Sequence, residues 1–283
     1  MKHLLITWVQ RSHLVQHQST SSRSFIGRTL LLLKVTIVSL VFVACQDDSP
    51  VRRRPPVSTE VLDTIKTLKG STPIAPGLFE TAFLQSTALA PNKKTISLTG
   101  INIGKLKIPG GKIIACDPLH MDEYGLPFTQ VFPTGEFPVQ LSIAALEGDE
   151  RIAFGRIVFS DAPVVRWEMA LQKDQKPRPV GGEEIEGYAV DAGVVIFLDE
   201  ETKKSLNKSG IENLNSELFA EMNKHNHNKW KYAMHDFQNQ NLAAFTTGLG
   251  DGRYATYIGF DITGKPCRLV TDFELFDWKQ NKQ

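Results

Sequence analysis

Alternation of apolar and polar residues between positions 95 and 108 limits the possible folds of this chain more than any other feature. The segment TISLTGINIGKLKI places isoleucine or leucine at alternate positions, with glycines where the alternation shifts by one residue. A period of two is typical of a β-strand with one buried face. Gly110 and Gly111 follow, and then an apolar run at 113–116, so we expect a hairpin that joins two strands.

Further strand patterns fill most of the remaining chain, whereas helical patterns are few. Strand-like segments bounded by turn residues lie at 137–143, 151–159, 164–171, 187–190, 194–198, 242–246, 254–260 and 268–275. A short capped helix is predicted from residue 59 to Gly70, and a long helix over 199–223. The sequence therefore predicts an α+β fold, mainly antiparallel β-sheet, with one long and one short helix.

Residues 1–44 are predicted to be a secretory leader that takes no part in the fold. They carry five basic residues and no acidic ones, and positions 29–44 read TLLLLKVTIVSLVFVA. A basic segment followed by such an apolar run is typical of a secretory signal. The four residues FVAC that end at Cys45 resemble a lipobox, in which the cysteine thiol accepts a diacylglyceryl group. The alternative is an uncleaved anchor helix with Cys45 as an ordinary residue.

Residues 45–58 are expected to form a lipidated tether, and residues 59–283 a single β-rich domain. The segment QDDSPVRRRPPVS after Cys45 is rich in proline and charge and lacks aromatic residues, and such a composition cannot bury enough surface to fold. Acyl chains on one cysteine would hold the body at a lipid bilayer without a spanning helix. Because the acidic pair after Cys45 resembles the export signal of surface lipoproteins, we expect a lipid-anchored protein of the bacterial cell envelope, at the outer membrane.

Charge and cysteine content argue against several classes of protein. The chain carries 32 Lys and Arg against 31 Asp and Glu, a net charge of +1, so no excess of positive charge favours nucleic acid as a partner. Three cysteines are too few for a disulfide scaffold or a four-cysteine metal site. We predict no cofactor and no metal.

Four sequence blocks, taken together, resemble a known family. They are GKIIACDPL (111–119), FPTGEFPVQLSIA (132–144), GYAVDAGVVIFLDE (187–200) and GDGRYATYIGFDITGKPCRLVTDF (250–273). In order and approximate spacing they are similar to the bacterial domain-of-unknown-function family 4241, over about residues 78–275. The resemblance implies a single domain. It implies no activity, substrate or cofactor, so no catalytic residue is carried over from it.

Four aspartates stand where an apolar strand ends or turns: Asp117, Asp191, Asp251 and Asp272. Carboxylates at strand ends can converge on one rim, where two or three would bind a hard cation such as Ca²⁺ or act as an acid and base pair. The alternative is turn chemistry, because aspartate caps turns and tolerates unusual backbone angles. Asp272 interrupts a buried strand pattern, so its carboxylate is expected either to pair with Arg253 or Arg268 or to belong to a site.

The histidines give weaker signals than the aspartates. His225 and His227 are separated by one residue, and on a helix this spacing places two rings about 200° apart, so we expect no metal site there. His120 follows Asp117 closely and could join the rim. His235 precedes an aspartate, but the chain contains no G-x-S-x-G nucleophile motif.

Two cysteines remain once Cys45 is lipidated. Exported proteins fold in an oxidising compartment, so Cys116 and Cys267 could form a disulfide bond. Two buried free thiols are the equally weighted alternative.

The aromatic residues offer a candidate binding surface. Arg253, Tyr254 and Tyr257 lie beside a glycine-rich turn, where they could stack on a sugar or hold an extended peptide. The alternative is that these rings belong to the hydrophobic core.

Taken together, these patterns predict a lipoprotein that faces the cell surface or the periplasm and carries a β-rich binding domain for a peptide, glycan or protein. The alternative is a hydrolase of envelope or extracellular polymers that uses the strand-end carboxylates. A structural subunit of an envelope complex is a third possibility. In a hydrolase at least two carboxylates should share a concave pocket, whereas in a binding module they should be scattered among turns.

Overall fold

Antiparallel strands are the most abundant secondary structure of this protein, whose computed structural model describes residues 77–89, 95–206 and 208–278. All of these residues belong to one compact unit, Val57–Gln283. The leader, Cys45, the tether and the helix predicted before Gly70 lie outside the described residues. Among the helices that are described, none is long and apolar enough to cross a membrane.

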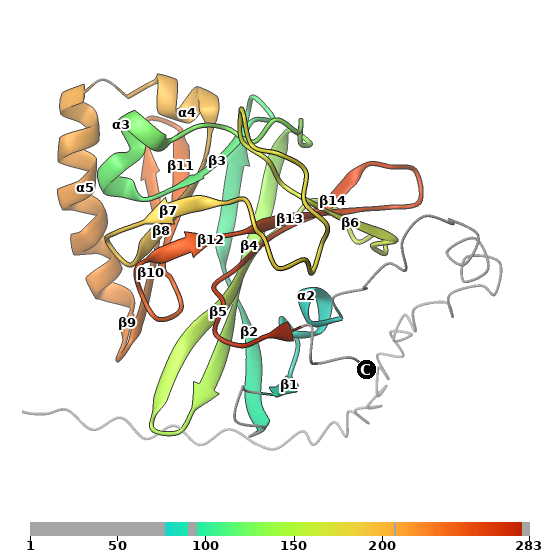
Figure 1. Cartoon of the computed structure of the whole chain (residues 1–283). Coiled ribbons are helices and arrows are strands. Elements are labelled where there is room, and N and C mark those ends of the chain that lie inside the picture. The colour runs from blue at the N-terminus through green and yellow to red at the C-terminus, as the bar shows by residue number, and fades with distance from the viewer. Residues whose placement is uncertain (1–76, 90–94, 207, 279–283) are drawn as a thin grey trace, which may run out of the picture. The chain divides into compact units, whose positions relative to one another are not determined.

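The larger sheet has seven strands in the order β1-β2-β4-β5-β14-β13-β6, and all neighbours are antiparallel. In Figure 1, β2, β4 and β5 stand upright, whereas β13 and β14 cross the molecule obliquely, so this sheet is strongly twisted. Its strands are β1 (Ser86–Leu89), β2 (Thr95–Ile108), β4 (Gly135–Leu146), β5 (Asp149–Val158), β6 (Arg166–Met169), β13 (Thr256–Phe260) and β14 (Pro266–Asp272).

A second sheet of five strands packs beside the first, in the order β3-β8-β11-β10-β9, and is also antiparallel. Its strands are β3 (Ile113–Cys116), β8 (Val194–Asp199), β9 (Asn226–His227), β10 (Trp230–Phe237) and β11 (Gln240–Thr246). A two-stranded ribbon completes the β-structure, formed by β7 (Tyr188–Val190) and β12 (Gly252–Tyr254).

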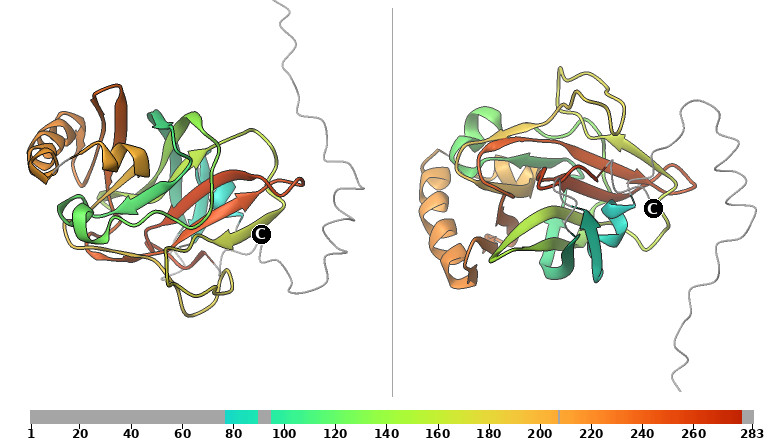
Figure 2. Two further views of the ribbon diagram at one scale, coloured as in Figure 1. Left: turned by 90° about the horizontal axis from the view of Figure 1, so that it is seen from above. Right: turned by 60° about the horizontal axis from the view of Figure 1, so that its bottom comes forward.

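The described helices are short except for one. They are α2 (Leu78–Thr81), the 3₁₀ helix η1 (Pro118–His120), α3 (Met121–Tyr124), α4 (Glu200–Lys204), α5 (Lys208–Met222) and the 3₁₀ helix η2 (Asn223–His225). Figures 1 and 2 show α5 flanking the five-stranded sheet on the side away from the larger sheet. The α5 side chains Leu214, Leu218 and Met222 are buried there against apolar residues of β3, β8, β10 and β11.

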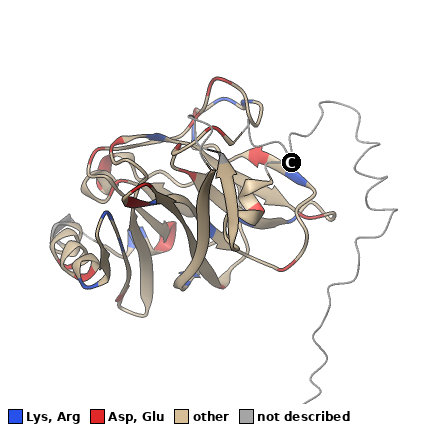
Figure 3. Cartoon of the chain, turned by 90° about the horizontal axis from the view of Figure 1, so that it is seen from below, with Lys and Arg blue, Asp and Glu red and all other residues tan. Residues whose placement is uncertain are grey.

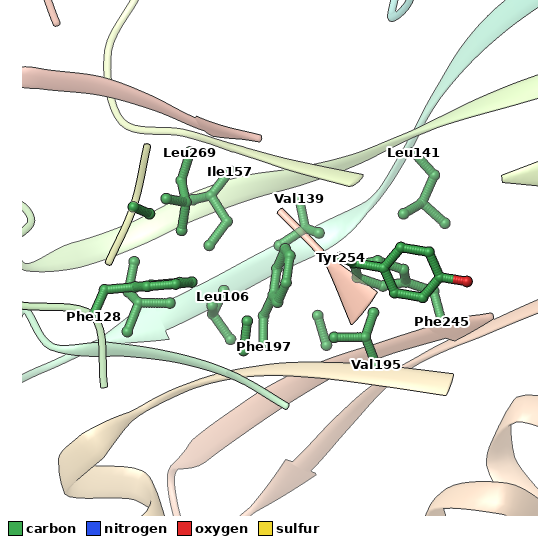
Figure 4. Packing of buried hydrophobic residues seen from close by; sticks show 14 of the residues in the cluster. Leu106, Phe128, Val139, Leu141, Ile157, Val195, Phe197, Phe245, Tyr254 and Leu269 are labelled. Atoms are coloured by element: carbon green, nitrogen blue, oxygen red, sulfur yellow. The ribbon is translucent and has the colours of Figure 1, made fainter. Parts of the chain in front are cut away.

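The main core lies between the two sheets. Phe197 of β8 and Phe245 of β11 meet edge to face, with ring centroids 5.0 Å apart, and pack with Val139 and Leu141 of β4 and Ile157 of β5 (Figure 4). These side chains reach the space between the sheets because every second residue of each strand points to the same face. Burial of this apolar surface is what joins the sheets.

The outer face of the larger sheet carries a second cluster, which is rich in aromatic residues. Phe79 of α2 lies at its centre, with its ring centroid between 4.8 and 5.8 Å from four other rings: Phe154, Trp167, Tyr257 and Trp278. Both faces of the seven-stranded sheet are therefore covered by apolar side chains.

Two buried arginines anchor α2 on that outer face. Arg268 Nε lies 3.0 Å from Glu80 Oε1, and Arg156 Nη1 lies 3.7 Å from Glu80 Oε2. Burial lowers the pKa of Arg156 to about 10, although the charge of Glu80 opposes this shift. Breaking a buried ion pair on one side leaves an uncompensated charge, so Glu80 fixes the position of α2 on the sheet.

The hairpin expected between residues 95–108 and 113–116 is wrong. β2 pairs with β1 and β4, whereas β3 pairs with β8 in the other sheet. The reason is that the backbone amides of Gly110 and Lys112 donate to Asp199 Oδ2 at 3.1 and 3.3 Å. These hydrogen bonds to Asp199, at the end of β8, hold the segment after β2 beside the five-stranded sheet, where β3 then pairs with β8.

The single long helix expected over 199–223 is also wrong. Asp199 caps α4 by accepting from the amide of Glu201 at 2.9 Å, and α4 ends at Lys204, before α5 begins at Lys208. Ser205 donates its hydroxyl to the carbonyl of Thr202 at 2.7 Å. Side-chain bonds of this kind compete with the helical backbone pattern. The coarser expectation, a mainly antiparallel β-sheet domain, is confirmed.

Candidate functional site

Three turns that follow strands meet at one edge of the molecule, and we refer to them as the acidic rim. The rim comprises η1 and α3 (118–124), the β7–β8 turn (191–193) and the β11–β12 loop (247–251). It includes Asp191 and Asp251, and it rests on Asp117. Three of the four aspartates singled out from the sequence therefore belong to this region.

Asp117 lies beneath the rim and holds it together. Its side chain is buried, and Oδ1 accepts from the amide of Leu119 at 2.8 Å, which caps η1. Oδ2 accepts from the amides of Asp191 and Ala192 at 2.8 and 2.7 Å. Three backbone N–H bonds satisfy this carboxylate in place of water. Asp117 thus fastens the β7–β8 turn to the end of β3.

Asp191 presents its side chain to solvent next to a histidine. Its carboxylate oxygen Oδ2 lies 3.6 Å from His120 Nε2, and the two side chains are 75% and 40% exposed. The ring of His120 also lies 5.9 Å from that of Tyr124, which is exposed. His120 therefore joins the rim, as its position in the sequence suggested.

The β11–β12 loop completes the rim. The amide of Thr247 donates to the carbonyl of Gly193 at 3.0 Å. A Cβ on Gly193, which has a φ of +61°, would lie 3.5 Å from Gly250 and 3.9 Å from an oxygen of Asp251. A positive φ and close backbone contact both suit glycine. Leu249 is 72% exposed at the tip of this loop, so apolar and acidic groups occur side by side.

Asp272 does not join the rim. Its Oδ2 accepts from the indole Nε1 of Trp278 at 2.8 Å, and its Oδ1 accepts from the amide of Glu274 at 2.9 Å. Trp278 belongs to the aromatic cluster on the outer face of the larger sheet. Of the arginines considered as partners, Arg268 pairs with Glu80, and Arg253 donates to the carbonyl of Gly187 at 2.9 Å.

The three residues expected to form a binding surface are separated. Tyr254 is buried between the sheets, and its hydroxyl donates to the carbonyl of Gly250 at 2.6 Å. Tyr257 is buried in the cluster on the outer face. Residues an odd number of positions apart on extended chain point to opposite faces. The rings of Tyr254 and Tyr257 accordingly lie in different clusters, one on each face of the larger sheet. Only Arg253 is exposed, so the expected trio does not form one surface.

The two cysteines of the folded body are free thiols, so the disulfide left open by the sequence is not formed. Cys116 packs beneath α5, and Cys267 lies in the larger sheet, where its thiol donates to the carbonyl of Gly259 at 3.3 Å. Burial raises the pKa of Cys116 to about 12 and that of Cys267 to about 11. Both thiols therefore stay protonated near neutral pH, where the reactive species would be the thiolate.

The rim combines exposed carboxylates, one imidazole and exposed apolar side chains: Leu119, Tyr124 and Leu249. Within residues 77–89, 95–206 and 208–278, no three His, Cys, Asp or Glu side chains gather in a way that could hold a metal ion. Sequence reasoning missed the exposed apolar residues, because the pattern of a short helix gives no sign of which side stays uncovered.

Comparison with known protein families shows to which family the chain belongs. A family described as "Protein of unknown function (DUF4241)" matches residues 106–271. The chain belongs to this family. The matched segment runs from the last residues of β2 to β14, so it includes the five-stranded sheet, the larger sheet except β1 and most of β2, and the whole acidic rim. The resemblance found in the sequence is confirmed. No curated protein and no solved structure matches the chain.

We expect Asp117→Asn to lower the free energy of unfolding by about 2–3 kcal/mol, because hydrogen bonds to a buried charged group are each worth about 1.5–3 kcal/mol. Asparagine keeps the shape of the side chain, but its NH₂ group would face a backbone N–H donor. Urea denaturation of the full chain measures the effect. The matched control is Asp191→Asn, whose exposed side chain should change stability by about 0.5 kcal/mol or less. Equal losses in both variants would contradict the role given to Asp117.

Proposed function

We propose that this protein is a lipid-anchored lipoprotein of the bacterial cell envelope, at the outer membrane, whose folded body is a binding module. Cys45 carries the acyl chains, residues 45–58 form the tether, and the body faces the cell surface or the periplasm. The ligand is a peptide or protein segment, with a glycan as the alternative of the same binding class.

The support for the anchor comes from the order of segments along the chain. A basic, acid-free stretch precedes the apolar run 29–44, and the lipobox-like FVAC is followed at once by a polar, proline-rich segment. Acyl chains contribute about 0.8 kcal/mol per buried methylene, so two or three chains anchor a protein stably. The apolar residues of the body are buried between the two sheets and beneath α5, which suits a folded domain held at the membrane by its anchor alone.

The observation that favours binding over hydrolysis is the use made of the strand-end carboxylates. Asp117 and Asp272 are buried and accept hydrogen bonds from backbone amides and an indole. A general acid or base has to reach its substrate, which leaves Asp191 and Asp251 for the hydrolase alternative. The structural hydrogen bonds of Asp117 and Asp272 are sufficient to explain why these two carboxylates are buried, and no catalytic role is needed.

The rim itself suggests the chemistry of the ligand. Exposed Leu119, Tyr124 and Leu249 offer apolar contacts next to the carboxylates of Asp191 and Asp251. A peptide that presents an apolar side chain and a basic or hydrogen-bond-donating group complements both features. Figure 3 shows basic and acidic residues interspersed over the body, so local groups and not a large field of one sign would set the specificity.

Metabolic labelling with palmitate tests the anchor. Wild type should incorporate the label and remain with the membrane fraction, whereas Cys45→Ser should lose both properties, because the acyl chains need the thiol. Cys116→Ser is the control and should stay labelled, since this thiol is buried in the folded body. Equal labelling of Cys45→Ser and wild type would overturn the anchor.

Photo-crosslinking from the rim tests the binding module. A photoreactive amino acid at Tyr124 should give an adduct of defined mass in cells that produce the full chain, and Asp191→Asn in the same chain should weaken it. The matched control is position Ile262, which is 60% exposed in the turn between β13 and β14. The same adducts at both positions, or none at Tyr124, would rule out the rim as the binding surface.

A further inference from the structure

A small hairpin at the edge of the five-stranded sheet carries four aromatic rings on one side. β9 and β10 form this hairpin, and His227 pairs directly with Trp230 across it. Continuing the same register places His225 opposite Tyr232. The rings of His227 and Trp230 are stacked, with centroids 4.1 Å apart and planes 11° apart. Those of His225 and Tyr232 are also stacked, at 4.6 Å and 22°.

The sequence argument against a metal site at His225 and His227 assumed a helix, and the structure shows a strand at His227 instead. On a helix, residues two apart point in different directions, whereas on an extended strand they point to the same face. His225 ends η2, and His227 lies in β9. Both rings lie close to that of Tyr232 and nearly parallel to it, His225 at 4.6 Å and 22° and His227 at 6.2 Å and 7° between centroids and planes. Their Cα atoms are roughly 7 Å apart at extended spacing.

The imidazole nitrogens of this pair are available to a ligand. Both histidines are exposed, and no described residue forms a hydrogen bond or an ion pair with either ring. The rings are nevertheless held in place, because each rests on an aromatic partner, and Trp230 is itself fixed by donating to Glu150 Oε2 at 3.1 Å. Stacking thus orients the two imidazoles before any ligand arrives, which lowers the ordering cost of binding.

The charges around the hairpin select between classes of cation. Lys224 and Lys229 are exposed beside the histidines, and Lys231 donates to Asn223 Oδ1 at 2.7 Å. A basic surrounding with imidazole ligands is unsuited to hard cations such as Ca²⁺, which take oxygen ligands. Imidazole suits copper, zinc and nickel, and for a given site affinity is greatest for Cu²⁺. Exposed lysines are well screened, so their repulsion weakens such binding without preventing it.

We propose that His225 and His227 together bind one divalent transition-metal ion, with Cu²⁺ bound most tightly. Two imidazole nitrogens provide two ligands, and water completes the coordination. This inference is independent of the proposed function, because the hairpin lies in β9 and β10 and the rim in other turns. In the described part of the chain, no three His, Cys, Asp or Glu side chains gather in a way that could hold a metal ion, which is compatible with a site made of two.

Titration of the full chain with Cu²⁺, followed by tryptophan fluorescence and calorimetry, tests the proposal. Bound Cu²⁺ should quench Trp230, because its ring lies 4.1 Å from that of His227. The variants His225→Phe and His227→Phe keep an aromatic ring for stacking but remove the nitrogens. Each should lower the Cu²⁺ affinity at least tenfold, and the double variant should lose little more, since chelation needs both. Trp230→Phe should remove the quenching and keep the binding.

The matched control is His120→Phe, which changes a half-buried histidine outside the hairpin and should leave the quenching unchanged. If the double variant bound Cu²⁺ within about twofold of wild type, the hairpin would be an aromatic platform only and the proposal would be overturned. Loss in only one of the two single variants would also overturn it.

Discussion

Two buried carboxylates, one at each end of the β3–β8 pair, determine how the loops of this protein are arranged. Asp199 accepts from the amides of Gly110, Lys112 and Glu201, and Asp117 accepts from the amides of Leu119, Asp191 and Ala192. Each of the two carboxylates therefore compensates its own desolvation with three backbone donors. The donors come from segments distant in sequence, so the two side chains fix where the chain changes sheet, where α4 begins and where the β7–β8 turn lies.

This arrangement explains why an aspartate at the end of a strand is a poor guide to chemistry in this family member. The same residue type that supplies acids, bases and calcium ligands also satisfies the amides of turns. Burial distinguishes the two uses: Asp117 is 2% exposed, whereas the side chain of Asp191 is 75% exposed. The buried carboxylate builds the acidic rim, and the exposed one is available to a ligand. The function proposed for the rim depends on this division.

Local patterns predicted the strands well but not their partners. Alternation identified β2 and β4, because one buried face leaves a period of two in the sequence, and strand-like segments bounded by turn residues identified β5 and β8. The hairpin after β2 was wrong because the pairing of β3 is decided by Asp199, about ninety positions away, and no local pattern records such a contact. β10 was missed although Trp230, Tyr232 and Met234 alternate with lysine, alanine and histidine, because this segment directly follows a polar stretch. The side-by-side histidines could be recognised only once that strand was known.

Hydrogen exchange at the amides of Asp191 and Ala192 tests the role of the buried carboxylates most directly. Both amides lie in a turn outside any strand pairing, so without Asp117 they should exchange nearly as fast as in an unfolded chain. The account predicts protection by at least about a hundredfold in the wild-type protein, corresponding to a local opening free energy of about 3 kcal/mol. In Asp117→Asn this protection should disappear, while the amides of Gly110 and Lys112 keep theirs. Rapid exchange of Asp191 and Ala192 in the wild-type protein would contradict the account.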